Sequence, residues 1–184
     1  MAKVKALIYR ILFFLSGMKD RFMIRIFLRT NSKAQHVFFV DIDNTIADTW
    51  PSFLQKWPSE ANRLASIPAF EGMKNYLRQI ETEKGNLIIY LTARNIRYKG
   101  LTQQWLQSRG FPVHNTRLVL VATPGEKLPY IKMPGKGFTV TYIDDLAFGH
   151  ETGQVKKYET VINAVKKLPL TYVGSEEINI INEL

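Results

Sequence analysis

The sequence contains no cysteine, only three histidines and no long apolar run free of charged residues. Without cysteine, the chain has no disulfide framework, no zinc–thiolate site and no thiol nucleophile. This absence is compatible with the cytosol, and we expect a cytoplasmic protein. The histidines are scattered and lack the spacing of metal ligands. Disulfide-stabilised, zinc–thiolate and thiol-dependent classes of protein are therefore excluded.

Acidic residues are scarce in the first 35 residues, which hold eight Lys or Arg and a single acid, Asp20. This segment has a net charge of +7 out of +9 for the chain, so residues 36–184 are left with +2. A nucleic-acid-binding body would be expected to spread its basic residues across the fold. We therefore interpret residues 1–35 as a basic, amphipathic helical segment and residues 36–184 as a nearly neutral domain.

The N-terminal segment has features of a membrane-surface attachment. Its apolar stretch 6–15 is interrupted by Arg10, and a spanning helix needs about twenty apolar residues. After Gly17, arginines recur every four residues over 21–29, which places them on one helix face. We expect two short helices that attach residues 1–30 to an anionic membrane, at its inner face. The alternatives are packing against the domain or a second subunit in a homo-oligomer, and a cleaved signal peptide.

Beyond residue 36, short apolar runs alternate with segments of helical periodicity. Strands are predicted over 37–42, 87–91, 118–121, 139–143 and 170–173, and helices over 69–83, 98–109, 127–132 and 152–167. Strands that alternate with helices predict an α/β fold with a parallel sheet of about five strands. The stretch 50–66 is rich in proline and aromatic residues and is too short for a domain, so we interpret it as an irregular flap.

Polar side chains follow three of these predicted strands. Asp41 and Asp43 come at the end of the first, Thr92 ends the second, and Asp144 and Asp145 follow the fourth. The carboxyl ends of parallel strands lie along one edge of a sheet, where ligands bind. Two carboxylates as close as those of the first pair repel each other unless a cation binds between them or one is protonated. The pattern indicates a hard cation such as Mg²⁺, an acid/base carboxylate, or both.

These motifs resemble those of the haloacid dehalogenase (HAD) superfamily, and in particular its compact, capless phosphatases. The matching residues are Asp41, Asp43 and Thr45 for the Asp-x-Asp-x-Thr motif, Thr92 for the strand ending in threonine, and Asp144 and Asp145 for the acidic pair. The resemblance covers about residues 36–150 and implies a Rossmann-like three-layer sandwich, with the short flap instead of a cap domain. Capless members act on bulky substrates or use a neighbouring subunit as their lid.

The resemblance implies a role for each acidic residue. Asp41 would attack phosphorus to form an aspartyl-phosphate, and Asp43 would protonate the leaving oxygen and then activate water. The implied Mg²⁺ ligands are Asp41, the backbone carbonyl of Asp43, Asp144 and, through water, Asp145. The implied activity is therefore the Mg²⁺-dependent hydrolysis of a phosphomonoester.

The substrate phosphate would be bound by the residues that end the second strand, Thr92, Ala93 and Arg94. Thr92 would donate its hydroxyl to the phosphoryl oxygens. Arg94 either clamps the phosphate or forms a surface salt bridge.

A lysine would also neutralise charge on the transferred group, as members of this superfamily require. Three candidates precede the fourth strand: Lys127, Lys132 and Lys136. We prefer Lys127 because of its position at the start of the short helix in the loop after the third strand.

Two other functions remain open from the sequence. The chain could be a polynucleotide-end phosphatase whose basic N-terminal arm binds nucleic acid, with binding that weakens steeply with salt. It could also be a non-catalytic phosphate-binding or scaffold module, because a fold alone does not establish activity. The class of phosphorylated substrate does not follow from the sequence.

Overall fold

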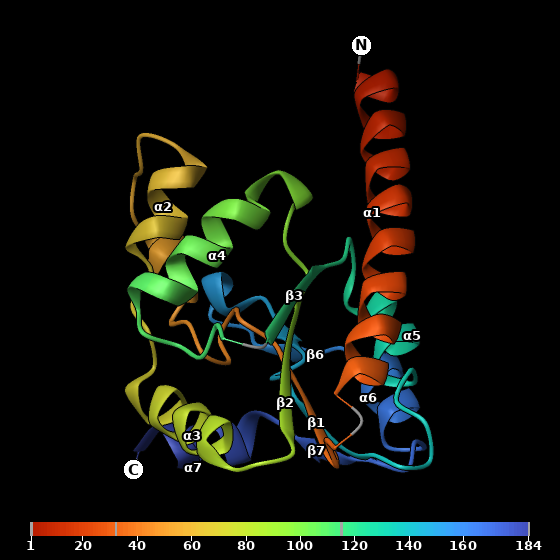
Figure 1. The fold of residues 1–184 in the computed structure, drawn as a ribbon. Helices are drawn as coiled ribbons and strands as arrows, with labels where there is room; N and C mark the ends of the chain where they lie inside the picture. The colour runs from red at the N-terminus through yellow and green to blue at the C-terminus, as the bar shows by residue number, and fades with distance from the viewer. Residues whose placement is uncertain (1, 32, 115, 184) are drawn as a thin grey trace.

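The computed structural model describes residues 2–31, 33–114 and 116–183, which form an α/β fold around one central parallel sheet (Figure 1). Its strands are β1 (His36–Val40), β2 (Asn86–Thr92), β3 (Thr116–Leu120), β4 (Thr139–Ile143) and β7 (Thr171–Val173). They lie in the order β3-β2-β1-β4-β7, and every neighbouring pair is parallel. The predicted fold class and the parallel five-stranded sheet are therefore confirmed.

The side chains of β1 alternate between two apolar layers. Val37 and Phe39 belong to one buried cluster and Phe38 and Val40 to the other, as the two-residue period of a strand requires. The first layer is covered by α1 (Ala2–Thr30), α5 (Leu128–Ile131) and α6 (Glu159–Val165). The second is covered by α2 (Glu60–Ser66), α3 (Glu71–Thr82), α4 (Lys99–Ser108) and α7 (Ser175–Glu183). The protein is thus a three-layer sandwich with β1 buried on both faces.

The N-terminal segment forms one helix where we predicted two, because Gly17 does not interrupt α1. Glycine in a helix interior costs about 1 kcal/mol relative to alanine. Here the missing side chain lets α5 approach: the Tyr130 hydroxyl donates to the Gly17 carbonyl at 3.3 Å. Further along α1, Ile24, Phe27 and Leu28 are buried in the core. The division into units 1–35 and 36–184 stays a prediction.

No part of the described chain forms a helix with both the length and the apolar character of a membrane span.

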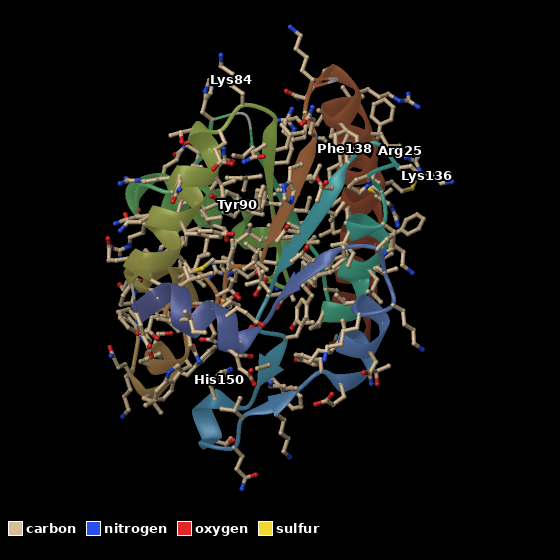
Figure 2. The ribbon with its side chains drawn as sticks, turned by 90° about the horizontal axis from the view of Figure 1, so that it is seen from below. Arg25, Lys84, Tyr90, Lys136, Phe138 and His150 are labelled. Carbon is tan, nitrogen blue, oxygen red and sulfur yellow. The ribbon has the colours of Figure 1, made fainter. Side chains whose placement is uncertain are left out.

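The helices predicted over 69–83 and 98–109 are present, but the helix predicted over 152–167 is wrong in its first half. That region holds β5 (Ala147–Phe148), the 3₁₀ turn η4 (His150–Thr152) and β6 (Lys156–Lys157). Its two glycines, Gly149 and Gly153, have φ angles of 77° and 71°, which a continuous right-handed helix cannot contain. The result is a hairpin that projects from the body with His150 in it (Figure 2).

The flap contains more regular structure than the irregular stretch we predicted. It consists of the 3₁₀ turn η1 (Trp50–Leu54) followed by α2. Arg63 of α2 connects the two, because it donates to the Ser52 hydroxyl at 2.7 Å and stacks over the Phe53 ring at 4.1 Å. The Trp57 indole donates to the Ser52 carbonyl at 2.7 Å. A short, internally bonded flap therefore takes the place of a cap domain.

The C-terminal helix α7 was not predicted. It packs on α3 so closely that a Cβ at Gly72 would lie 2.0 Å from the Ile181 carbonyl oxygen. The backbone of α3 also donates to α7, from the Met73 N–H to the Asn182 side chain at 3.1 Å. Gly72 is therefore required by the approach of the two helices, and α7 completes the second layer.

Candidate active site

Three strand ends bring the predicted motifs to one edge of the sheet. Asp41 continues the ladder of β1, since its N–H donates to the Ile143 carbonyl of β4 at 2.9 Å. Asp144 likewise donates to the Val173 carbonyl of β7 at 3.1 Å, and Thr92 ends β2 on the other side of β1. The three strand ends border a small pocket of about 160 Å³, which is lined by Asp41, Thr92 and Asp144 together with Asp43, Ala93, Lys127 and Asp145. Every predicted site residue except Arg94 borders this pocket.

A tight turn after β1 holds the first motif in place. Asn44 has a φ of 55°, a left-handed conformation that asparagine tolerates better than most residues. Its N–H donates to the Ala47 carbonyl at 2.8 Å and so closes the turn. The Thr45 hydroxyl accepts from the Asp145 N–H at 3.2 Å. This bond fastens the first motif to the acidic pair after β4.

Of the three candidate lysines, Lys127 is the one placed among the carboxylates. Its ammonium lies 2.7 Å from Asp41 Oδ1 and 2.6 Å from Asp144 Oδ2, and only 3% of the side chain is exposed. Burial would lower the pKa of Lys127, but the negative charges of Asp144 and Asp41 have the larger combined effect and raise this pKa. The lysine is therefore charged. Lys132 and Lys136 are exposed.

Three buried carboxylates lie together here, and Lys127 contacts two of them, Asp41 and Asp144. Oxygen atoms of Asp41, Asp144 and Asp145 lie within 4.8 Å of one another. Burial, aided by the Asp144 charge, raises the pKa of Asp145 to about 9; burial also raises that of Asp41 to about 7, against the effect of Lys127. Asp145 Oδ2 is buried and makes no hydrogen bond within the described residues, although His150 Nε2 lies 3.3 Å away. An all-oxygen set with excess negative charge and an unsatisfied oxygen fits a hard divalent cation such as Mg²⁺.

Asp43 is bound by a buried guanidinium. Arg94 donates from Nε to Asp43 Oδ2 at 2.7 Å and from Nη2 to Oδ1 at 2.6 Å, and the Thr49 hydroxyl donates to Oδ1 at 2.8 Å. Burial would raise the pKa of Asp43, but Arg94 and Thr49 outweigh it and the pKa is lowered. Of our two alternatives for Arg94, the structure shows a salt bridge, in which the Arg94 side chain is buried and that of Asp43 is partly exposed. Both carboxylate oxygens of Asp43 therefore accept hydrogen bonds, and the group of carboxylates close enough to hold one cation consists of Asp41, Asp144 and Asp145.

Tyr142 and Thr49 belong to the site and were not identified from the sequence. The Tyr142 hydroxyl donates to Asp144 Oδ2, and the Leu146 N–H donates to Asp144 Oδ1 at 2.9 Å, so both carboxylate oxygens are oriented. Tyr142 lies two residues before Asp144 on an extended segment, and this spacing could have revealed that both point to one side. Thr49 reaches Asp43 only through the turn that follows the motif, which has no comparable sequence signal.

We expect the metal-free protein to lose stability as the pH rises from 7 to 9. The folded-state pKa values of Asp41 and Asp145 are about 7 and 9, against about 4 in the unfolded chain, so only the folded form still binds these protons. Stability falls with pH wherever the folded state binds more protons. The pKa of His36 is lowered by burial, so His36 titrates below this range.

The midpoint of thermal unfolding, measured in EDTA, should therefore drop by several degrees between pH 7 and pH 9. The drop should be smaller in an Asp145→Asn variant, which carries no charge at this position, and smaller when Mg²⁺ replaces EDTA. A midpoint that stays level or rises with pH in EDTA would contradict the charge state assigned to this cluster.

Comparisons with known proteins show a likeness at the level of the fold. No family model matches the chain, and no curated protein sequence matches it. A crystal structure of a class C acid phosphatase from Bacillus anthracis with tungstate bound is similar, with a TM-score of 0.50 over 95% of this chain and 79% of that chain. The two are 16% identical in sequence, so the likeness shows the fold alone. In this chain the four carboxylates of the pocket and Lys127 lie at the carboxyl edge of the sheet of that fold.

Proposed function

We propose that the protein is a Mg²⁺-dependent phosphomonoester hydrolase that acts through an aspartyl-phosphate on Asp41. The observation that carries the proposal is the arrangement around this carboxylate. Asp41 ends the central strand, lies 2.7 Å from the Lys127 ammonium and shares a pocket with two further buried aspartates. Nucleophile, fixed cation and oxygen ligands therefore converge on one point. The HAD-like motifs and the fold shared with a phosphatase support the same reaction class.

The size of the pocket favours recognition of the phosphoryl group over recognition of the rest of the substrate. A volume of about 160 Å³ is well below the roughly 300–1,000 Å³ of sites that enclose a whole small molecule. The Thr92 hydroxyl donates to Asp43 Oδ2 only over a long distance of 3.5 Å. It can therefore donate a hydrogen bond to a phosphoryl oxygen instead. The alcohol part of the substrate would then lie outside, next to the flap.

The reaction would proceed in two displacements at phosphorus. An oxygen of Asp41 forms a bond to phosphorus while the ester P–O bond breaks, and the departing alkoxide takes up a proton. Water then attacks the aspartyl-phosphate, the P–O bond to Asp41 breaks, and inorganic phosphate leaves with Asp41 regenerated. Lys127 is close enough to the nucleophile to balance charge on the transferred group throughout.

Asp43 is better suited to the second displacement than to the first. Its lowered pKa means that it is ionised, which is the form that the second displacement requires, and that it accepts the proton of the attacking water only as a weak base. Donation to the leaving group in the first displacement requires that Asp43 first take up a proton within its Arg94 salt bridge. Substrates with good leaving groups, which need no proton, should therefore react fastest.

Mg²⁺ would be held by Asp41, the Asp43 carbonyl, Asp144 and, through water, Asp145, and would supply charge neutralisation for the phosphoryl oxygens. Asp144 is already oriented for this by Tyr142 and by the Leu146 N–H. Lys127 contacts the other side of the site as well, because its ammonium lies 2.6 Å from Asp144 Oδ2.

Phosphate release from an aryl phosphate tests this function. We expect turnover with Mg²⁺ and its loss in EDTA, with recovery when Mg²⁺ is added back. A panel of phosphomonoesters, from sugar phosphates and nucleotides to lipid phosphates, would then define the substrate class. Release that continues at the same rate in EDTA would contradict the metal dependence, and no release from any phosphomonoester would contradict the function itself.

A further inference from the structure

α1 has two chemically different sides. The inner side packs on the domain through Ile24, Phe27 and Leu28, which are all buried. The outer side carries a second row of large apolar side chains at intervals of three or four residues. They are Ile11, Leu15, Met18, Phe22 and Ile26, between 37% and 62% exposed. We call these five residues the outer row.

Cations accompany the outer row, and acids do not. Lys19, Arg25 and Arg29 are exposed on α1, and Figure 2 shows Arg25 at the periphery of the molecule. The single acid of this segment, Asp20, is turned inward: it is buried and accepts from the Lys99 ammonium at 2.8 Å. Over residues 11–30 the outer side of α1 therefore combines apolar side chains with positive charge that forms no ion pair among the described residues.

α1 also extends past the edge of the sheet that holds the pocket. It runs antiparallel to β1, and its first turns project beyond the body (Figure 1). Phe13 and Gly17 border a groove with Leu120 and Ala122, at the end of β3. Asp20 forms an ion pair with Lys99, the first residue of α4, in the connection that follows β2. The part of α1 before residue 13 consequently lies beyond the catalytic edge, on the same side as Asp41.

We propose that α1 docks on an anionic lipid surface through the outer row, with Lys19, Arg25 and Arg29 binding the lipid phosphates. Interfacial helices combine these two features: apolar side chains enter the boundary between headgroups and acyl chains, and basic residues pair with anionic lipid. A second copy of the chain is a poorer occupant, because a two-fold contact through this face would bring like charges together. Nucleic acid would use the cations but would leave the outer row in water.

Co-sedimentation of the full chain with lipid vesicles tests the proposal without reference to catalysis. We expect binding to vesicles that contain phosphatidylglycerol, weaker binding to pure phosphatidylcholine, and weakening as salt is raised. A Leu15→Gln/Phe22→Gln variant, which changes only exposed side chains, should lower the partition coefficient by about tenfold or more. An Arg25→Gln/Arg29→Gln variant should lower it by a similar factor on anionic vesicles only.

The matched control is Lys166→Gln/Lys167→Gln, which removes the same charge from exposed positions after α6 and should bind like the wild type. Unchanged unfolding midpoints show that the variants are folded. The proposal is overturned if the full chain does not bind anionic vesicles, or if the outer-row variant binds them as the wild type does. It is also overturned if the outer row instead holds a dimer, so that Leu15→Gln/Phe22→Gln converts a dimer in solution to a monomer.

Discussion

An Asp41→Asn variant should release phosphate at least about 10³-fold more slowly than the wild type while remaining folded. Asparagine keeps the shape of the side chain but has no carboxylate oxygen with which to attack phosphorus. It also removes a carboxylate whose pKa is raised to about 7 by burial and, to a lesser extent, by the charges of Asp144 and Asp43. Lys127 retains its contact with Asp144, 2.6 Å away. We therefore expect loss of activity with no loss of stability in metal-free buffer at pH 8.

Asp48→Asn is the matched control for this variant. It makes the same chemical change in the same loop, at a residue that does not line the pocket. It should keep nearly the full rate of phosphate release. If Asp41→Asn and Asp48→Asn retain similar activity, Asp41 is not the nucleophile.

Replacing Lys127 by methionine should strongly reduce both stability and activity. Methionine has a similar length, but the change leaves Asp41 and Asp144 buried without their common cation. Removal of one partner from a buried ion pair costs about 3–5 kcal/mol. For a chain of this size each kcal/mol lowers the unfolding midpoint by about 2–4 °C, so a fall of roughly 6–20 °C is expected at pH 8 in EDTA.

Lys132→Met is the control, because Lys132 is exposed and lies five residues further along. It should leave the midpoint and the rate of phosphate release close to those of the wild type. The midpoint of Lys127→Met should recover partly at low pH, where the carboxylates take up protons. A Lys127→Met variant as stable and active as Lys132→Met would show that the buried ammonium has neither role.

The sheet could be predicted from sequence because its signals are local. The central strands β1 and β2 are buried on both faces, and their buried parts are uninterrupted apolar runs over 37–40 and 87–91, while β4 contains two threonines but is buried after its first residue. Once parallel pairing is inferred, the residues that end these strands must lie along one edge. The pocket position of Asp41, Thr92 and Asp144 follows from this rule. Lys127, which we preferred over Lys132 and Lys136, is the lysine that contacts Asp41 and Asp144, and its role toward phosphate stays a prediction.

The elements that were missed depend on contacts between distant parts of the chain. Gly17 is tolerated inside α1 because Tyr130, 113 residues away, packs against it. The burial of Arg94 against Asp43 joins two loops and has no signal in either one. In the region of β5 and β6, helical periodicity was misleading because the positive φ angles of Gly149 and Gly153 determine the backbone. In this region the two glycines indicate the break in the helix better than the spacing of the apolar residues does.

The central claim, that Asp41 accepts the phosphoryl group, is tested most directly by quenching the enzyme in acid during turnover of an aryl phosphate. This substrate needs no proton on its leaving group, so the first displacement is fast and the intermediate accumulates. Mass spectrometry of the digested protein should then find one phosphoryl group on the peptide that contains Asp41, and none in Asp41→Asn. Turnover of the aryl phosphate with no phosphoryl group on Asp41 would contradict the account.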